Sequence, residues 1–182
     1  MIKYINSFSQ INISNLKTLV VLDIDDTLIS FKDVNTIWWD INYKKLYPIY
    51  KENTYNHLEK LWTDYIFNNN PMKLDTDNLT SFLKNIKNNN HELVILTARD
   101  KSILELTMRH LYDCGIYIDS SRVFFNRNKG YELKKIVMNL FPDVDNIIFV
   151  DDIIQNLVNV EISFNIPELL KYNLELYRIK HI

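Results

Sequence analysis

The sequence predicts an α/β fold: a doubly wound, Rossmann-like parallel sheet flanked by helices, with a small, mainly helical insert after the first strand. Short apolar runs of strand length alternate along the chain with amphipathic segments of helical length. Such alternation is typical of right-handed crossovers, which build a parallel sheet covered by helices. The main apolar runs also end in acidic or hydroxyl residues, at the edge where open α/β sheets bind their ligands.

Length and composition fit one domain over residues 1–182. Of the 182 residues, 47% are hydrophobic and 24% are charged, so the chain can form a packed core. The net charge of −2 gives no general attraction for nucleic acid or acidic membranes. No apolar run reaches the length of a membrane span, and the N-terminus lacks a signal-peptide core. A single cysteine, Cys114, excludes an internal disulfide, and we expect a soluble cytoplasmic protein.

The first main strand is expected over residues 18–24, where apolar residues follow one another without alternation. This pattern is typical of a strand buried on both faces. Residues 5–16 are weakly amphipathic and are expected to form an introductory helix or an irregular arm. A turn or small hairpin is expected over residues 28–34. Asp26 and Thr27 are also compatible with plain turn and cap roles.

A small cap insert is expected over residues 36–71, because aromatic residues gather there. They are Trp38, Trp39, Tyr43, Tyr47, Tyr50, Tyr55, Trp62, Tyr65 and Phe67. The helical spacing of Tyr55, Leu58 and Trp62 predicts a helix, and Pro48 is expected to break the helix before it. Two interpretations of the aromatic residues remain open. They form a core, or they line the entrance of a substrate cavity.

Helices and strands are expected to alternate after the insert. The expected strands cover residues 93–96, 123–125, 147–150 and, in the tail, 174–182. Four helices are expected. The first is capped by Asp77 and has an inward face of Leu79, Phe82, Leu83 and Ile86, and the second is capped by Asp100 and stopped by Gly115. The third begins near Lys129, ends before Pro142 and has an inward face of Leu133, Ile136, Val137 and Leu140, and the fourth carries Ile154, Leu157 and Val158.

Polar residues collect at one edge of this predicted sheet. They are Asp23, Asp25, Thr97, Lys129, Asp151 and Asp152. Carboxylates that converge on one edge repel one another unless a cation lies among them or some stay protonated. Oxygen ligands without histidine or cysteine favour Mg²⁺ over zinc, and Mg²⁺ also accepts phosphate oxygens. With two glycines in the chain, no glycine-rich phosphate loop can form, so another device must bind a phosphoryl group.

The ordered set of motifs resembles that of the haloacid dehalogenase (HAD) superfamily of aspartate-nucleophile phosphotransferases. The matching residues are the Asp-x-Asp-x-Thr motif of residues 23–27, then Thr97, Lys129, and the acidic pair Asp151-Asp152. The match covers residues 19–157 in the order of the family. The stretches 5–8, 96–99 and 149–152 also resemble a little-characterised, mostly bacterial branch, which supplies no substrate.

The resemblance implies a role for each of these residues. Asp23 would attack phosphorus and form an aspartyl-phosphate. Asp25 would protonate the leaving oxygen and then activate water, while its backbone carbonyl would bind Mg²⁺. Thr97 and Lys129 would bind the phosphoryl group.

The metal site implied by the resemblance contains Asp23, Asp25 and the acidic pair. Asp152 is the expected direct ligand from that pair, with Asp151 close by or reaching the metal through water. Many relatives have a further aspartate where this chain has Asn156, which weakens the site slightly.

Plainer roles stay open for several candidates. Lys134 and Lys135 are rivals of Lys129, and Thr97 is also compatible with a turn cap. The acidic pair could cap a helix. Arg99 is either a substrate contact or a partner in a surface ion pair.

The expected activity is Mg²⁺-dependent hydrolysis of a phosphomonoester, a small molecule or a macromolecule. Nucleic acid is expected only as a phosphorylated end. Asp25 counts against dehalogenation, since the dehalogenase branch lacks that aspartate, and the absence of a membrane span counts against the ion-pump branch. By analogy, a small cap suits large substrates. A catalytically silent binding module and a phosphotransferase to an acceptor other than water remain alternatives.

Overall fold

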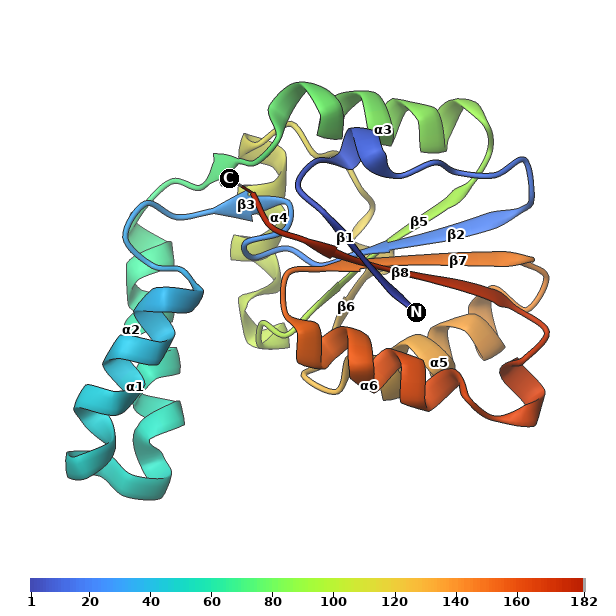
Figure 1. Cartoon of the computed structure of the whole chain (residues 1–182). Coiled ribbons are helices and arrows are strands. Elements are labelled where there is room, and N and C mark those ends of the chain that lie inside the picture. Colours follow the sequence, from blue (N-terminus) through green and yellow to red (C-terminus); the bar gives the residue numbers. More distant parts are fainter. Residues whose placement is uncertain (182) are drawn as a thin grey trace.

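A six-stranded parallel sheet forms the centre of the molecule, with the strand order β1-β8-β7-β2-β5-β6 (Figure 1). The computed structural model describes residues 1–181, apart from the side chain of Thr36. The strands are β1 (Ile2–Ile5), β2 (Thr18–Leu22), β5 (Glu92–Thr97), β6 (Val123–Phe125), β7 (Asn146–Asp151) and β8 (Asn173–Ile179). Every neighbouring pair in this sheet is parallel, which confirms the predicted α/β class.

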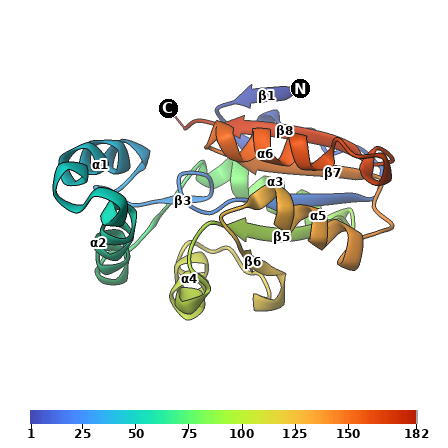
Figure 2. The ribbon, with the colours of Figure 1, turned by 90° about the horizontal axis from the view of Figure 1, so that it is seen from below.

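The side chains of β2 explain why helices cover both faces of the sheet. Val20 and Leu22 pack into one core cluster, whereas Leu19 and Val21 pack into another, and all are fully buried. Because successive side chains of a strand point to opposite faces, an unbroken apolar run requires a helical layer on each side. The first cluster includes residues of α3 (Thr76–Asn88) and α4 (Leu104–Asp113), and the second includes residues of α5 (Lys129–Leu140) and α6 (Ile154–Phe164). Figure 2 shows α5 and α6 on their face of the sheet.

The strand register aligns the carboxyl ends of the central strands. Leu22 of β2 lies beside Val150 of β7 and Ile95 of β5. The residues that follow these positions therefore emerge at one edge of the sheet. The sequence predicted this edge as the functional one.

The insert is a hairpin of two helices, and it projects from the side of the molecule where the carboxyl ends of the central strands lie (Figure 1). It consists of α1 (Thr36–Tyr50), a short 3₁₀ turn (Lys51–Asn53) and α2 (Thr54–Asn68). An antiparallel ribbon of β3 (Ile29–Ser30) and β4 (Met72–Lys73) joins its two ends. Pro48 lies inside α1, so the prediction that it breaks the helix is wrong. The helix ends two residues later, at Tyr50, and the next residue, Lys51, has a φ of 52°.

Of the two alternatives expected for residues 5–16, the irregular arm is present: the segment contains one 3₁₀ turn (Phe8–Gln10), and the short strand β1, which ends at Ile5, pairs with β8 at the far end of the chain. Two further local predictions are wrong. Asp75, and not Asp77, precedes α3, and its carboxylate accepts hydrogen bonds from Ser7 Oγ at 2.8 Å and the Phe8 amide at 2.7 Å. Leu140 is exposed because it lies at the end of α5.

None of the helices in the described part of the chain combines the length and apolar character of a bilayer-crossing segment.

Candidate active site

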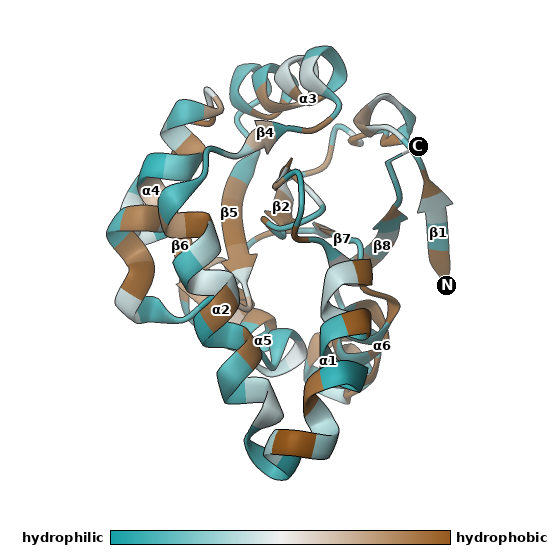
Figure 3. Cartoon of the chain, turned by 90° about the vertical axis from the view of Figure 1, so that its left-hand side faces the viewer, coloured by the Kyte–Doolittle hydropathy of each residue, from teal (hydrophilic) through white to brown (hydrophobic). Residues whose placement is uncertain are grey.

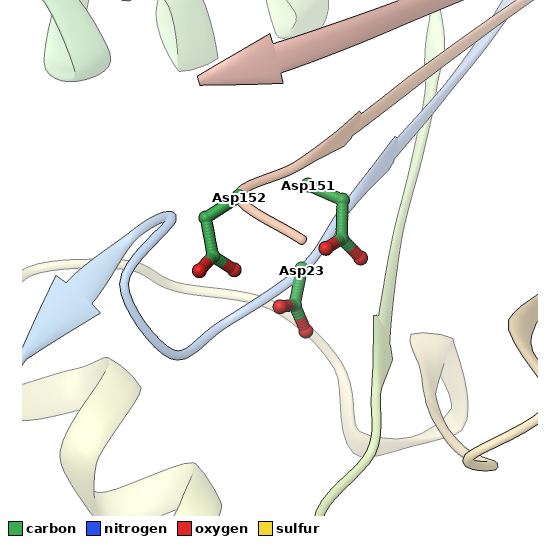
Figure 4. A group of neighbouring side chains, drawn as sticks. All are labelled: Asp23, Asp151 and Asp152. Carbon is green, nitrogen blue, oxygen red and sulfur yellow. The ribbon is translucent and has the colours of Figure 1, made fainter. Parts of the chain in front are cut away.

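Three carboxylates meet at the carboxyl ends of β2 and β7. Asp23 follows β2, Asp151 ends β7, and Asp152 is the next residue. One oxygen of each lies within 4.8 Å of the others, and Figure 4 shows the three carboxyl groups side by side. The pairing of the two strands continues through the Asp23 amide, which donates to the Val150 carbonyl at 3.0 Å. The predicted convergence of Asp23 with the acidic pair is therefore present in the structure.

Lys129, the first residue of α5, bridges two of these carboxylates. Its Nζ lies 2.6 Å from Asp23 Oδ1 and 2.7 Å from Asp151 Oδ2. Its side chain is buried, and although burial by itself lowers the pKa of this lysine, the charges of Asp151 and Asp23 raise it above the ordinary value. Its rival Lys135 instead pairs with Glu132 at 3.7 Å. Lys129 therefore supplies one fixed positive charge to the cluster.

Close packing of two helices holds Lys129 in place. The next residue, Gly130, lies so near α6 that an added Cβ would be 2.4 Å from the Asn159 carbonyl oxygen. Only glycine allows this approach without moving a helix. The N-terminal turn of α5 is thus pressed against α6 at the point where the lysine enters the site.

The cluster contains more acidic groups than one lysine can balance. Burial raises the pKa of Asp23 to about 7, with Lys129 opposing this shift and Asp151 adding to it. Burial and the neighbouring charges of Asp23 and Asp151 raise the pKa of Asp152 to about 8. The shifts have this direction because burial and neighbouring negative charges both disfavour the ionised form of a carboxyl group. Oxygen ligands without histidine or cysteine are compatible with a divalent cation such as Mg²⁺.

Asp151 and Asp152 differ in what surrounds them. Asp151 is fully buried, accepts from the Ile153 amide at 2.8 Å, and receives Asn156 Nδ2 at 3.0 and 3.1 Å in addition to Lys129. Asp152 instead lines the cavity described below. Asn156 thus binds Asp151.

Asp25 is held by Arg99, which follows β5. The guanidinium donates from Nε to Asp25 Oδ2 at 2.8 Å and from Nη2 to Oδ1 at 2.7 Å. The Arg99 side chain is only 1% exposed, whereas that of Asp25 is 32% exposed. The carboxylate of Asp25 lies outside the group of three that could hold a metal ion. Of the two roles considered for Arg99, an ion pair is present, but the arginine of this pair is buried and lies in the wall of the cavity described below.

Two residues of α4 complete the surroundings of Arg99, and sequence reasoning missed both. Nη1 donates to Thr107 Oγ1 and to His110 Nδ1, each at 3.3 Å. Burial, followed by the charges of Arg99 and Arg109, lowers the pKa of His110 to about 4, so its ring is neutral and can accept. The signal available in the sequence was their spacing of three residues, which places them on one face of a helix.

Thr97 ends β5 beside this network. Its hydroxyl accepts a hydrogen bond from the Arg99 amide at 3.2 Å, and its side chain is buried. Since a hydroxyl is both donor and acceptor, its proton remains for another partner.

A cavity of about 500 Å³ opens over these groups. Asp23, Asp25, Thr97, Lys129 and Asp152 line one part of it, and the aromatic residues Trp39, Tyr55 and Trp62 of the insert line another. Trp38, Trp62 and Tyr65 also pack against the core. Some aromatic residues of the insert therefore pack against the core, and others line a cavity.

The α/β fold of this chain has a counterpart among solved structures. The class C acid phosphatase from Bacillus anthracis matches with a TM-score of 0.53 and 16% identity, over 91% of this chain and 67% of that chain. This likeness shows that the two proteins share the α/β fold.

The chain itself belongs to the family described as "Protein of unknown function (DUF2608)", which matches residues 3–126. The match includes Asp23, Asp25, Thr97 and Arg99 and ends before Lys129 and the acidic pair. A comparison with curated proteins finds no match.

Proposed function

We propose that this protein is a Mg²⁺-dependent phosphomonoester hydrolase that forms an aspartyl-phosphate on Asp23. The observation that carries the proposal is the contact of Lys129 with both Asp23 and Asp151, beside Asp152 and under an open cavity. Phosphoryl transfer depends mainly on positioning and charge neutralisation, which this arrangement provides. The shared fold with a protein named as an acid phosphatase supports the same reaction class.

Asp23 has the surroundings of a nucleophile. Lys129 contacts Oδ1 of this carboxylate, which leaves Oδ2 to attack phosphorus in line with the leaving oxygen. With a pKa of about 7, the Asp23 carboxyl group is partly protonated at neutral pH, so a bound divalent cation would favour its reactive, ionised form. When bound, Mg²⁺ would neutralise charge on the phosphoryl oxygens and on the carboxylates that hold it, Asp23 and Asp152, together with the Asp25 carbonyl.

Asp25 would move protons in both halves of the reaction. It would donate one to the leaving oxygen and later remove one from the water that attacks the aspartyl-phosphate. Arg99 fixes the orientation of its carboxylate, and each carboxylate oxygen keeps the capacity for a second hydrogen bond toward the cavity. Thr97 would donate its hydroxyl proton to a phosphoryl oxygen, and Lys129 would offset the charge that the phosphoryl group brings.

The test is hydrolysis of 4-nitrophenyl phosphate with Mg²⁺ or with EDTA, by wild type and by Asp23→Asn. We expect Mg²⁺-dependent turnover that falls at least about 100-fold in the variant, because the nucleophile is lost. Asp77→Asn, at an exposed position of α3, is the matched control. Equal turnover by wild type and Asp23→Asn would contradict the proposal, and a silent binding module would show no turnover at all. Trapped aspartyl-phosphate that is discharged only by an added acceptor would instead indicate a phosphotransferase.

A further inference from the structure

The aromatic residues of the insert line the cavity on the side where a leaving group must lie. The inference drawn from this position rests on the proposed function, in which Asp25 protonates the leaving oxygen. The guanidinium carbon of Arg99, which holds Asp25, lies 5.4 Å from the centre of the Trp62 ring. A leaving group that starts at Asp25 and extends into the cavity therefore passes close to Trp62.

Beyond Trp62, the cavity wall continues as a chain of rings. Trp39 lies 6.4 Å from Trp62 and 6.2 Å from Tyr55, measured between ring centres, and the Trp39 and Tyr55 rings are stacked at 29°. Trp39 comes from α1, and the other two lie two turns apart on α2. Tyr55 is 59% exposed, so much of its surface is available to a ligand. Packing of α1 against α2 alone does not require an aromatic ring that is exposed at this position.

The cationic side chains that line the described part of the cavity already have partners. Arg99 pairs with Asp25, Arg127 with Glu59, and Lys129 with Asp23 and Asp151. The same wall also carries Asp26 and Asp40. A second anionic group on the substrate would thus meet carboxylates without gaining a new ion pair.

The insert does not attract a polyanion. Between residues 36 and 68 acidic and basic residues are equal in number, and Figure 3 shows hydrophilic and hydrophobic segments mixed along α1 and α2. Binding along a nucleic-acid backbone requires an excess of lysine and arginine. The rings therefore suit a small molecule better than a polynucleotide strand.

We propose that the substrate is a small phosphomonoester whose alcohol carries one flat, uncharged aromatic ring, and that this ring binds against Tyr55 and Trp39. Flat rings gain from stacked or edge-to-face contacts that a saturated ring of the same size does not make. A substrate with a second anionic group is discriminated against.

Binding of phosphonates tests this without requiring turnover. Benzylphosphonate and cyclohexylmethylphosphonate share the anionic head and resist hydrolysis, and each carries a six-membered carbon ring that is aromatic and flat in the first and saturated and puckered in the second. In the presence of Mg²⁺, we expect benzylphosphonate to bind between about twofold and tenfold more tightly, measured by calorimetry. Equal affinities, or no detectable binding of either compound, would overturn the inference.

Variants assign the preference to the proposed residues. The ratio of the two dissociation constants should fall toward one in Tyr55→Leu and in Trp39→Leu, and should be kept in Tyr55→Phe, which retains the ring. Tyr47→Leu is the matched control, since Tyr47 lies on the same insert but does not line the cavity. Because each ratio is measured within one protein, partial loss of folded material cancels. An unchanged ratio in Tyr55→Leu and Trp39→Leu would refute the assignment.

A third compound tests the discrimination against charge. The 4-carboxy derivative of benzylphosphonate keeps the ring and adds one anion, and we expect it to bind at least about threefold more weakly than the parent. Equal or tighter binding would show that the cavity accepts a second anion. Ring preference without Asp23-dependent hydrolysis would contradict the proposed function only, whereas hydrolysis without ring preference would contradict this inference only.

Discussion

Arg99 donates two parallel hydrogen bonds to Asp25, at 2.7 and 2.8 Å, from a side chain that is itself almost fully buried. Paired N–H donors fix the plane of a carboxylate as well as its position. The proposed proton donor is therefore oriented by a residue that is itself buried and that lies in the wall of the cavity. Arg99 acts through Asp25 and is a positioning residue in the proposed reaction.

Arg99→Lys should lower kcat while changing KM little. Lysine keeps the charge but cannot form the paired contact, so Asp25 loses its fixed orientation. We expect a loss of about 10- to 100-fold with alkyl phosphates. The first half-reaction with 4-nitrophenyl phosphate should lose less, because 4-nitrophenolate leaves without a proton. Burst kinetics with both substrate types measure the difference.

Arg122→Lys is the control for this substitution. Arg122 forms a partly exposed pair with Glu92 at 2.8 Å, and it does not line the cavity. An equal loss with alkyl and aryl phosphates in Arg99→Lys would mean that Arg99 supports only the fold and does not position the proton donor.

His110 should make the fold less stable in acid. Its pKa is lowered from 6.5 to about 4, so between these values the unfolded chain binds a proton that the folded protein does not. The contribution of His110 to the free energy of unfolding is therefore fully present above pH 6.5, and it is lost as the pH falls toward 4. The loss is roughly 2 to 3 kcal/mol.

His110→Asn keeps an acceptor for Arg99 but cannot titrate. The difference in unfolding free energy between wild type and this variant, measured by urea denaturation, should therefore change between pH 6.5 and pH 4. Taking the difference removes the opposite trends of Asp23 and Asp152, which are present in both proteins. A difference that stays constant with pH would show that His110 is protonated in the folded state.

The sequence predicted the sheet and the edge at which the carboxylates meet because both follow from local patterns. An unbroken apolar run predicts a strand buried on both faces, and parallel strands place the residues after them at one edge. Asp23 and Asp151 meet for this reason, since Leu22 and Val150 are paired in the sheet. No structural detail beyond strand order was needed.

The features that escaped prediction depend on contacts between distant parts of the chain. Ile2 pairs with Leu176, and Asp75 binds Ser7. The residues next to β1 and to the start of α3 in the sequence therefore do not predict either feature. Thr107 and His110 became partners of Arg99 only when α4 packed beside β5. A lone histidine carries no signal of such a contact.

Gly130→Ala should destabilise the protein and displace the lysine beside it. The added Cβ would meet the Asn159 carbonyl oxygen and Ser163 Oγ, each at 2.4 Å, so α5 and α6 must move apart. We expect a loss of about 1 to 3 kcal/mol in unfolding free energy, together with reduced turnover, since Lys129 moves with the helix end.

Gly115→Ala provides the contrast for this substitution. Gly115 has a φ of 69° and no neighbouring atom within 4 Å of an added Cβ, so it tests backbone strain alone. Its variant should lose about 1 kcal/mol and keep its turnover per folded molecule. Unchanged turnover in Gly130→Ala would mean that α5 does not set the position of Lys129.

Mg²⁺ should stabilise the fold more strongly at pH 8 than at pH 6. The pKa values of Asp23 and Asp152 are raised from 3.8 to about 7 and about 8, so the metal-free fold retains protons that the unfolded chain has released. This contribution to stability is present at low pH and is lost as the pH rises through those values. Mg²⁺ requires the ionised carboxylates and must displace these protons, so its affinity should rise at least about tenfold between pH 6 and pH 8.

Melting temperatures at several Mg²⁺ concentrations measure this rise, with NaCl at matched ionic strength as the control. Asp152→Asn should abolish most of the Mg²⁺-induced increase. A stabilisation by Mg²⁺ that is independent of pH, or that persists in this variant, would place the cation away from the three carboxylates.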